Sequence, residues 1–143
     1  MTVETILATK GRTVATIDPD RTLGHAAQEL STRRIGAVVI ADGAMTVLGI
    51  LSERDIVRAV AKRGAAALDE PVRQHMTAEV VTCKGHADIN EVMQLMTQGK
   101  FRHVPVVEDG RLSGIISIGD VVKQRLAEIE AESEALREYI QHA

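Results

Sequence analysis

The fold is decided by the stretch GILSERDIV (residues 49–57), which returns 65 residues later as GIISIGDVV (residues 114–122). Each copy carries an aspartate three positions after a serine, and these residues are Ser52, Asp55, Ser117 and Asp120. A repeat that retains these polar residues together with the apolar ones predicts a duplicated site as well as a duplicated core.

The sequence around the two copies repeats as well. Leu23 and Leu30, which belong to one apolar stripe, correspond to Ile89 and Met96 at an offset of 66, whereas Val39 corresponds to Val106 at an offset of 67. This drift predicts one residue gained before a strand of the second copy and two residues lost in its hairpin loop, because surface loops accept such changes most easily. Residues 3–7 also resemble residues 72–76.

Each copy has the pattern of a βαββα unit. Thr22 can cap a helix whose apolar residues follow the i, i+3, i+4, i+7 spacing of one buried face, and a hairpin then leads to a helix that begins at Ser52. In the first copy we expect strands at residues 13–17, 36–40 and 47–51; in the second, strands at 80–83, 103–107 and 112–116 and helices at 89–98 and from Ser117. The predicted organisation is a first repeat (3–64), a linker (65–71), a second repeat (72–126) and a helical extension (127–143).

Composition limits the class of function. The chain has 143 residues, a net charge of -3 and one cysteine, and Phe101 and Tyr139 are its only Phe, Tyr or Trp residues. The acidic balance and the lack of stacking side chains argue against nucleic-acid binding. No apolar run is long enough to span a membrane, and a single cysteine fits a reducing compartment. We expect a cytoplasmic protein with an aliphatic core that binds neither nucleic acid nor membranes.

The two strand-to-helix junctions carry the candidate binding chemistry. Ser52 and Ser117 stand at helix starts, where free backbone N–H groups and the helix dipole favour a bound phosphate. Asp55 and Asp120 follow one turn later, where a carboxylate can accept hydrogen bonds from two adjacent ribose hydroxyls. The alternative is a capping box, in which serine and aspartate satisfy the backbone of the helix start. Two copies in matching frames favour a binding site.

The two copies resemble a tandem pair of CBS domains, also called a Bateman module, of the stand-alone two-CBS type. The resemblance covers residues 3–126 and rests on the two motif copies together with FRHVPVV (residues 101–107). It implies an α/β fold of the α+β type, with two βαββα repeats packed sheet against sheet in pseudo-twofold symmetry. It also implies two clefts for adenosine-containing ligands such as AMP, ADP, ATP, NAD(H) or S-adenosylmethionine.

The resemblance further implies roles for residues in both clefts. The aspartates would bind ribose, the serines would lie near the phosphates, and the first strand of the opposite repeat would contact adenine. The residues implied for the first cleft are Ser52, Arg54, Asp55, Val80, Thr82, Arg102 and His103, and those for the second are Val14, Thr16, Ser117 and Asp120. Gly119 stands where the first copy has Arg54, so the second cleft offers less charge to a phosphate.

The residues after the second repeat predict a long helix. Its apolar positions are spaced 4, 3, 4, 3 and 4 residues apart, as in the seam of a coiled coil, and they are Val122, Leu126, Ile129, Ser133, Leu136 and Ile140. A helix docked on its own domain is the alternative. We also expect a homodimer, because the pair of repeats should expose an apolar helical face that a second copy covers; this face comprises Ile56, Val57, Val60, Val121, Val122 and Leu126.

The sequence predicts a regulatory protein and not an enzyme. The histidines lack metal-ligand spacing, Cys83 reads as a small apolar residue, and no catalytic triad pattern is present. We therefore predict no catalytic residue and no metal site. An adenosine-containing regulatory ligand (AMP, ADP, ATP or NAD(H)) would shift a conformational equilibrium that an unidentified regulated protein reads. The alternative is a structural dimerisation module with vestigial nucleotide sites.

Overall fold

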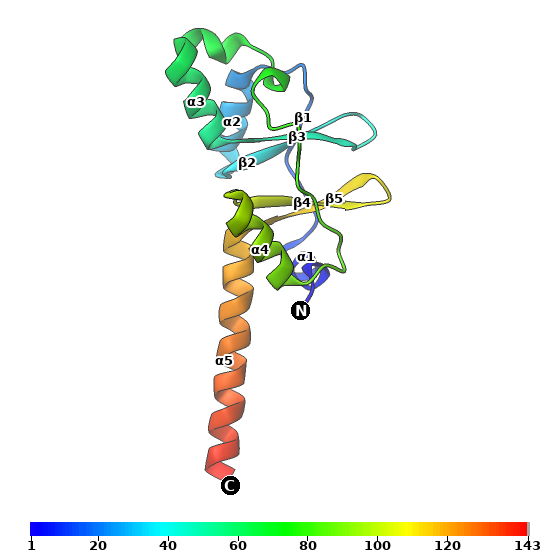
Figure 1. Cartoon of the computed structure of the whole chain (residues 1–143), viewed down its shortest axis with the longest axis vertical. Helices are drawn as coiled ribbons and strands as arrows, with labels where there is room; N and C mark the ends of the chain where they lie inside the picture. Colours follow the sequence, from blue (N-terminus) through cyan, green and yellow to red (C-terminus); the bar gives the residue numbers. More distant parts are fainter. Residues whose placement is uncertain (143) are drawn as a thin grey trace.

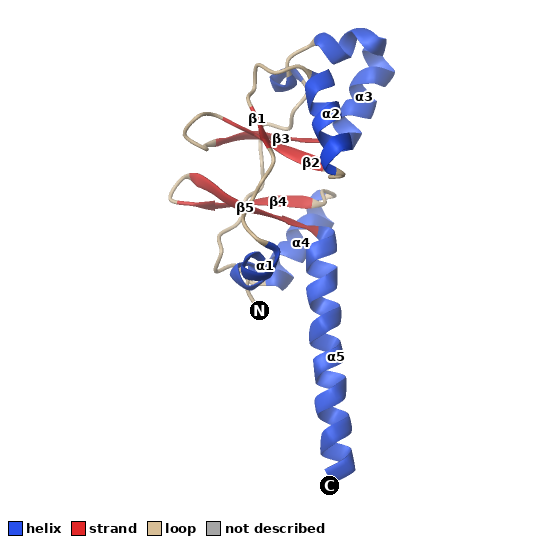
Figure 2. Cartoon of the chain, turned by 180° about the vertical axis from the view of Figure 1, so that it is seen from behind, coloured by secondary structure: helices blue, strands red, loops and turns tan. Residues whose placement is uncertain are grey.

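Two similar halves, each a small sheet covered by helices, make up the computed structural model, which describes residues 1–142 (Figure 1). The two sheets lie next to each other at the centre, and the helices lie on the outer sides (Figure 2). The elements are α1 (Val3–Lys10), β1 (Thr16–Ile17), α2 (Leu23–Arg33), β2 (Ala37–Ala41), β3 (Val47–Ser52), α3 (Glu53–Arg63), η1 (Gly64–Asp69), η2 (Val72–Gln74), α4 (Ile89–Gly99), β4 (His103–Glu108), β5 (Arg111–Ser117) and α5 (Ile118–His142). This arrangement is the α/β fold with a long C-terminal helix that the sequence predicts.

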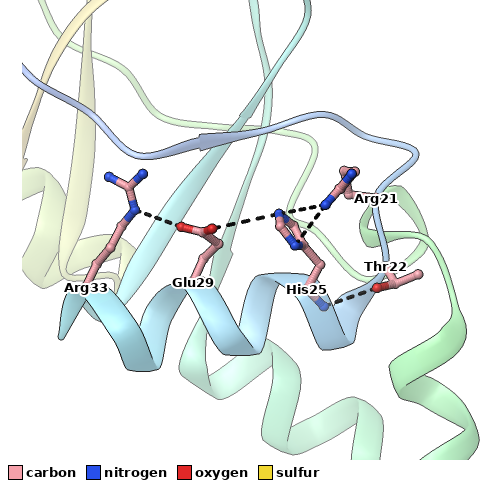
Figure 3. A network of polar contacts seen from close by, with 5 residues as sticks. All are labelled: Arg21, Thr22, His25, Glu29 and Arg33. Atoms are coloured by element: carbon pink, nitrogen blue, oxygen red, sulfur yellow. Dashed lines mark hydrogen bonds and ion pairs between the residues drawn. The ribbon is translucent and has the colours of Figure 1, made fainter.

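The first half contains a three-stranded sheet in the order β1-β2-β3, with β1 parallel and β3 antiparallel to β2. All five residues of β2 are buried, as expected of a continuously apolar central strand. The strand predicted at residues 13–17 is shorter than expected and forms only over Thr16–Ile17. Helix α2 begins as predicted, because the Thr22 hydroxyl accepts a hydrogen bond of 3.1 Å from the His25 N–H (Figure 3).

Among the described residues, the sheet of the second half consists of the antiparallel pair β4-β5. The strand predicted at residues 80–83 does not form, and the prediction is wrong there. A single parallel bridge joins Cys83 to Val106; the Cys83 N–H donates to the Pro105 carbonyl at 3.0 Å, and the Val107 N–H donates to the Cys83 carbonyl at 2.9 Å. Residue 83 alone therefore occupies the place that β1 has in the first half.

The strand registers correct the alignment of the two repeats. Ala37 lies opposite Ser52, and His103 lies opposite Ser117, so Ala37 corresponds to His103 at an offset of 66. By the same register Val39 corresponds to Pro105 and not to Val106. The predicted extra residue before the second strand is thus absent, and both hairpins carry an irregularity at the same place, after Ile40 and after Val106.

The segments that lead into the two repeats are exchanged between the halves. Side chains of α1 are buried in the core of the second half together with α4, β4, β5 and the start of α5; they are Val3, Ile6 and Leu7. Conversely, Ala67 in η1 and Val72 in η2 are buried in the core of the first half. The linker predicted at residues 65–71 is therefore partly core, and the packing crosses the predicted repeat boundaries.

The glycine that opens each motif copy makes room for this exchange. A methyl group at Gly49 would clash with Met76 Sδ and would lie 2.9 Å from the Thr77 carbonyl oxygen. At Gly114 it would lie 2.8 Å from Leu7 Cδ2. Leu7 and Met76 are corresponding residues of the two lead-in segments, so each glycine accommodates the segment that precedes the other repeat.

The part of helix α5 that extends beyond the second repeat does not dock on its own domain, so that alternative is wrong. It projects away from both sheets (Figures 1 and 2), and every residue from 129 to 142 is exposed. Ala143, the last residue of the predicted extension, lies outside the described residues. No helix within residues 1–142 is long and apolar enough to cross a membrane.

The apolar face expected between two copies is smaller than predicted. Val121 is fully buried in the second core, and Ile56 is half-buried against the first core. The remaining residues of this face are exposed; they are Val57, Val60, Val122 and Leu126. We refer to these four residues as the apolar helical face.

Candidate functional site

Ser52 and Asp55 form a capping box and can still serve as a binding site. The Asp55 N–H donates to the Ser52 hydroxyl at 3.4 Å, and the Ser52 N–H donates to Asp55 Oδ2 at 2.9 Å, which makes a capping box. The other carboxylate oxygen, Oδ1, lies 3.9 Å from an Arg58 nitrogen, too far for a hydrogen bond. The capping box thus uses Oδ2 and leaves Oδ1 able to accept hydrogen bonds from a ligand.

Asp55 borders a cavity of about 620 Å³, a size typical of small-molecule sites. Residues from both halves line it, as a cleft between two repeats requires. Six of the seven residues predicted for this cleft are brought together here; they are Ser52, Arg54, Asp55, Val80, Arg102 and His103. The seventh, Thr82, is exposed and does not line the cavity, because the strand that would have positioned it does not form.

Several lining residues were not predicted. Thr77 and Glu79 come from the segment after η2, and Lys100 follows the end of α4. The remaining unpredicted side chains include Glu53, Arg58 and Phe101. Phe101 is the first residue of the FRHVPVV stretch and Lys100 directly precedes it, so closeness to that motif could have indicated both residues. Thr77 and Glu79 lie in irregular chain and carried no such signal.

His103 stands at the first position of β4, half-buried between the two halves. Burial lowers the pKa of His103 below its ordinary value, and the neighbouring cations Lys10 and Arg102 lower it further, more than the carboxylates Asp120 and Glu53 raise it. The imidazole is therefore neutral at neutral pH and can donate one hydrogen bond and accept another.

The Asp120 site has the same capping geometry as the Asp55 site, but a lysine of the chain contacts its carboxylate. The Ser117 N–H donates to Asp120 Oδ2 at 2.8 Å, and the Asp120 N–H donates to the Ser117 hydroxyl at 3.2 Å. Lys10 Nζ, from the last turn of α1, donates to the same Oδ2 at 2.6 Å and to the Ile115 carbonyl at 2.9 Å. An internal lysine thus pairs with the charge of the carboxylate that was predicted to bind ribose, at the oxygen that the capping hydrogen bond already uses.

The electrostatics of Asp120 agree with this contact. Burial raises its pKa, but hydrogen bonds from Lys10 and Ser117 outweigh burial, and the net pKa lies below the ordinary value. Asp120 lines neither the 620 Å³ cavity nor the smaller one beside it, and neither do Val14, Thr16 and Ser117. The structure therefore brings the first predicted cleft together as a cavity, whereas in the second a lysine is bound to the aspartate.

Other candidate chemistry finds little support. Burial, with the charge of Glu108 as a second cause, raises the pKa of Cys83 to about 11, which disfavours the reactive thiolate. Within residues 1–142 no group of three or more His, Cys, Asp or Glu side chains is arranged to hold a metal ion.

Comparison with known proteins adds family relationships to this geometry. The family model described as "CBS domain" matches residues 5–62 and again residues 72–127. The chain is 35% identical over 126 residues to the mitochondrial CBS domain-containing protein CBSX3 of Arabidopsis thaliana, covering 85% of this chain but 61% of that relative. The chain therefore corresponds to only part of that relative.

Two solved structures have the same fold over most of the chain. The crystal structure of a CBS-domain containing protein from Agrobacterium tumefaciens is 52% identical and superposes with a TM-score of 0.84, covering 87% of this chain and 99% of that one. A CBS domain protein from Pyrobaculum aerophilum, complexed with AMP, is 28% identical with a TM-score of 0.79, covering 93% of this chain and 99% of that one.

Proposed function

The chain belongs to the CBS domain family, and on that premise we propose that it is a regulatory protein that binds an adenosine nucleotide in the cavity beside Asp55. The observation that carries the proposal is the convergence of Asp55, Arg102 and His103 on one cavity between the halves. The Pyrobaculum aerophilum protein of the same fold is complexed with AMP, which supports a ligand of this class.

The proposed contacts follow from the chemistry of the lining. Asp55 Oδ1 accepts hydrogen bonds from the ribose hydroxyls, and the Ser52 end of α3 lies near the phosphate. Val80 and Val81 offer an apolar surface to adenine from the other half of the chain. Because the ligand contacts both halves, its binding energy can shift their relative arrangement. A regulated partner protein then recognises the shifted arrangement. Binding, rather than catalysis, is the proposed activity.

A thermal shift assay with AMP tests this function. At a concentration of one hundred times Kd, one occupied site adds about 2.7 kcal/mol to the free energy of unfolding, or about 5–10 °C in Tm for a chain of this size. GMP serves as the control, since it carries the same ribose and phosphate. If AMP, ADP, ATP, NAD(H) and S-adenosylmethionine all leave Tm unchanged at millimolar concentration, the proposal is wrong.

A structural dimerisation module is the second candidate, favoured by the apolar helical face and by the exposed seam of α5. We propose that a second copy covers this face, because a self-complementary patch is most simply buried in a symmetric dimer. Light scattering should then give about twice the 15.5 kDa chain mass. Truncation after Leu126 should loosen the dimer and leave AMP affinity unchanged. A monomer at micromolar concentration would contradict the dimer.

A further inference from the structure

A second, more open cavity of about 380 Å³ lies beside the nucleotide cavity. Four residues line both cavities, so the two are adjacent; they are Arg54, Lys100, Phe101 and Arg102. Met96, Thr97 and Ile118 complete the lining of the smaller one. We call this smaller cavity the outer groove.

The charge of the outer groove differs from that of the larger cavity. Three of its seven lining residues are cations and none is a carboxylate. The larger cavity, in contrast, contains Glu53, Asp55 and Glu79 among its lining residues. Positive charge is therefore concentrated at the outer groove.

The three cations of the outer groove reach it from separate elements. Arg54 lies in the first turn of α3, Lys100 caps the end of α4, and Arg102 directly precedes β4. Within residues 1–142 no ion pair or side-chain hydrogen bond engages any of the three, whereas seven other arginines and lysines form ion pairs. Unpaired cations that converge from three elements repel one another, and an anionic ligand would relieve this repulsion.

We propose that the outer groove binds the phosphates beyond the first of an adenosine ligand, so that ADP and ATP are the preferred class over AMP and adenosine. The inference rests on the proposed nucleotide site, because the Asp55 carboxylate must fix the ribose for the phosphate chain to point into the groove. Arg102 contacts the first phosphate, and Lys100 with Arg54 contacts the next ones; a forked guanidinium suits each phosphate oxygen pair.

Calorimetric titrations with adenosine, AMP, ADP, ATP and NAD, in buffer without magnesium, test the assignment. We expect ATP and ADP to bind about tenfold or more tightly than AMP, since each added contact is a hydrogen bond between charged groups. The advantage should shrink as salt is added. NAD tests whether the groove requires a terminal phosphate, because the diphosphate of NAD bridges two nucleosides. We expect NAD to bind less tightly than ADP.

The matched variants are Lys100→Asn and Arg34→Asn. Both residues cap a helix with positive φ, 57° for Lys100 and 54° for Arg34, a conformation that asparagine tolerates. Lys100→Asn should remove most of the ATP advantage and leave AMP affinity within about twofold, whereas Arg34→Asn, outside both cavities, should change neither. Equal affinity of AMP and ATP, or equal losses for both in Lys100→Asn, would overturn the groove while leaving the nucleotide site. If no adenosine compound binds, the proposed function fails and the groove assignment fails with it.

Discussion

The two Ser-x-x-Asp sites share a backbone frame and differ in what surrounds the carboxylate. At both sites the serine and aspartate form the same pair of capping hydrogen bonds. Around Asp55 lies a cavity lined by several cations, whereas Asp120 is already paired with Lys10. The corresponding residue of the other lead-in segment is Glu79, which lines the Asp55 cavity and cannot pair with a carboxylate.

This difference shows that duplication of a motif does not duplicate a site. The strand registers place Gly36 and Ala37 where the other half has Arg102 and His103, and Gly119 stands in place of Arg54. Substitutions at positions other than the serine and the aspartate thus remove the phosphate-binding charge from one site, and Lys10 adds a competitor for its carboxylate. We expect one nucleotide for each chain, bound at Asp55.

The largest expected effect separates the two aspartates. Asp55→Ala should weaken AMP binding by about 1.5–3 kcal/mol, the range for hydrogen bonds to a charged group, whereas Asp120→Ala should leave AMP affinity nearly unchanged. Isothermal titration calorimetry measures both affinities and the stoichiometry of the wild type. Two equivalent sites in the wild type, or equal losses in the two variants, would break the comparison.

The next effect concerns the glycines that accommodate the lead-in segments. Gly49→Ala should lower the free energy of unfolding by about 2–3 kcal/mol, because the new methyl group would meet the Thr77 carbonyl as well as Met76. Gly114→Ala should cost about 1 kcal/mol, since only the flexible Leu7 side chain must move. Urea unfolding measures both, and Gly43→Ala, with open space around it, is the control. Equal costs would show that the two lead-ins are packed alike.

A smaller effect sharpens the role of Arg102. Arg102→Lys should weaken AMP about fivefold, roughly 1 kcal/mol, because an ammonium cannot reproduce the forked pair of donors, while adenosine affinity stays unchanged. Arg111→Lys, an exposed change at the start of β5 and away from both cavities, is the control. Parallel losses for AMP and adenosine would make Arg102 a structural residue and not a phosphate ligand.

The smallest effect is the stability contributed by Lys10. Lys10→Met should lower the free energy of unfolding by about 0.5–1 kcal/mol at neutral pH, the range of a solvent-accessible ion pair, and Lys84→Met should be neutral. Because the pKa of Asp120 is lowered in the folded protein, this stabilisation is complete above its ordinary value of 3.8 and is lost as pH falls below it. Urea unfolding at pH 7 and about pH 2.5 should therefore show the gap between Lys10→Met and wild type closing. A gap that persists in acid would assign the loss to packing.

Much of the fold could be predicted from the sequence because its signals are local. The helix-spaced apolar residues from Leu23 to Leu30 predicted α2, and the hydroxyl of Thr22 predicted where it starts. The grouping of Asp55 with Arg102 and His103 was implied by the resemblance to CBS domains, which the motif copies carry, although the ligand that they bind stays a prediction. The strand predicted at residues 80–83 was wrong, because a short apolar run resembles a strand whether or not it is paired.

The remainder depended on packing between distant segments. The spacing of Val3, Ile6 and Leu7 permits one buried helical face, but no local signal shows that this face belongs to the core of the second half. The same holds for Lys10, whose contact with Asp120 joins positions that are 110 residues apart. The register of β4 was misplaced by one residue, because several adjacent apolar residues align equally well with a buried strand.

The exchanged lead-in segments also set the order in which the chain can fold during synthesis. Helix α1 is synthesised well before its buried partners, which extend from Ile89 to Val121. Val3, Ile6 and Leu7 must therefore wait, exposed, until most of the chain has been made, and the second core closes last. The first core can form earlier, since Val72 completes it. Folding on the ribosome should thus begin with the first core and end when α1 docks on the second core.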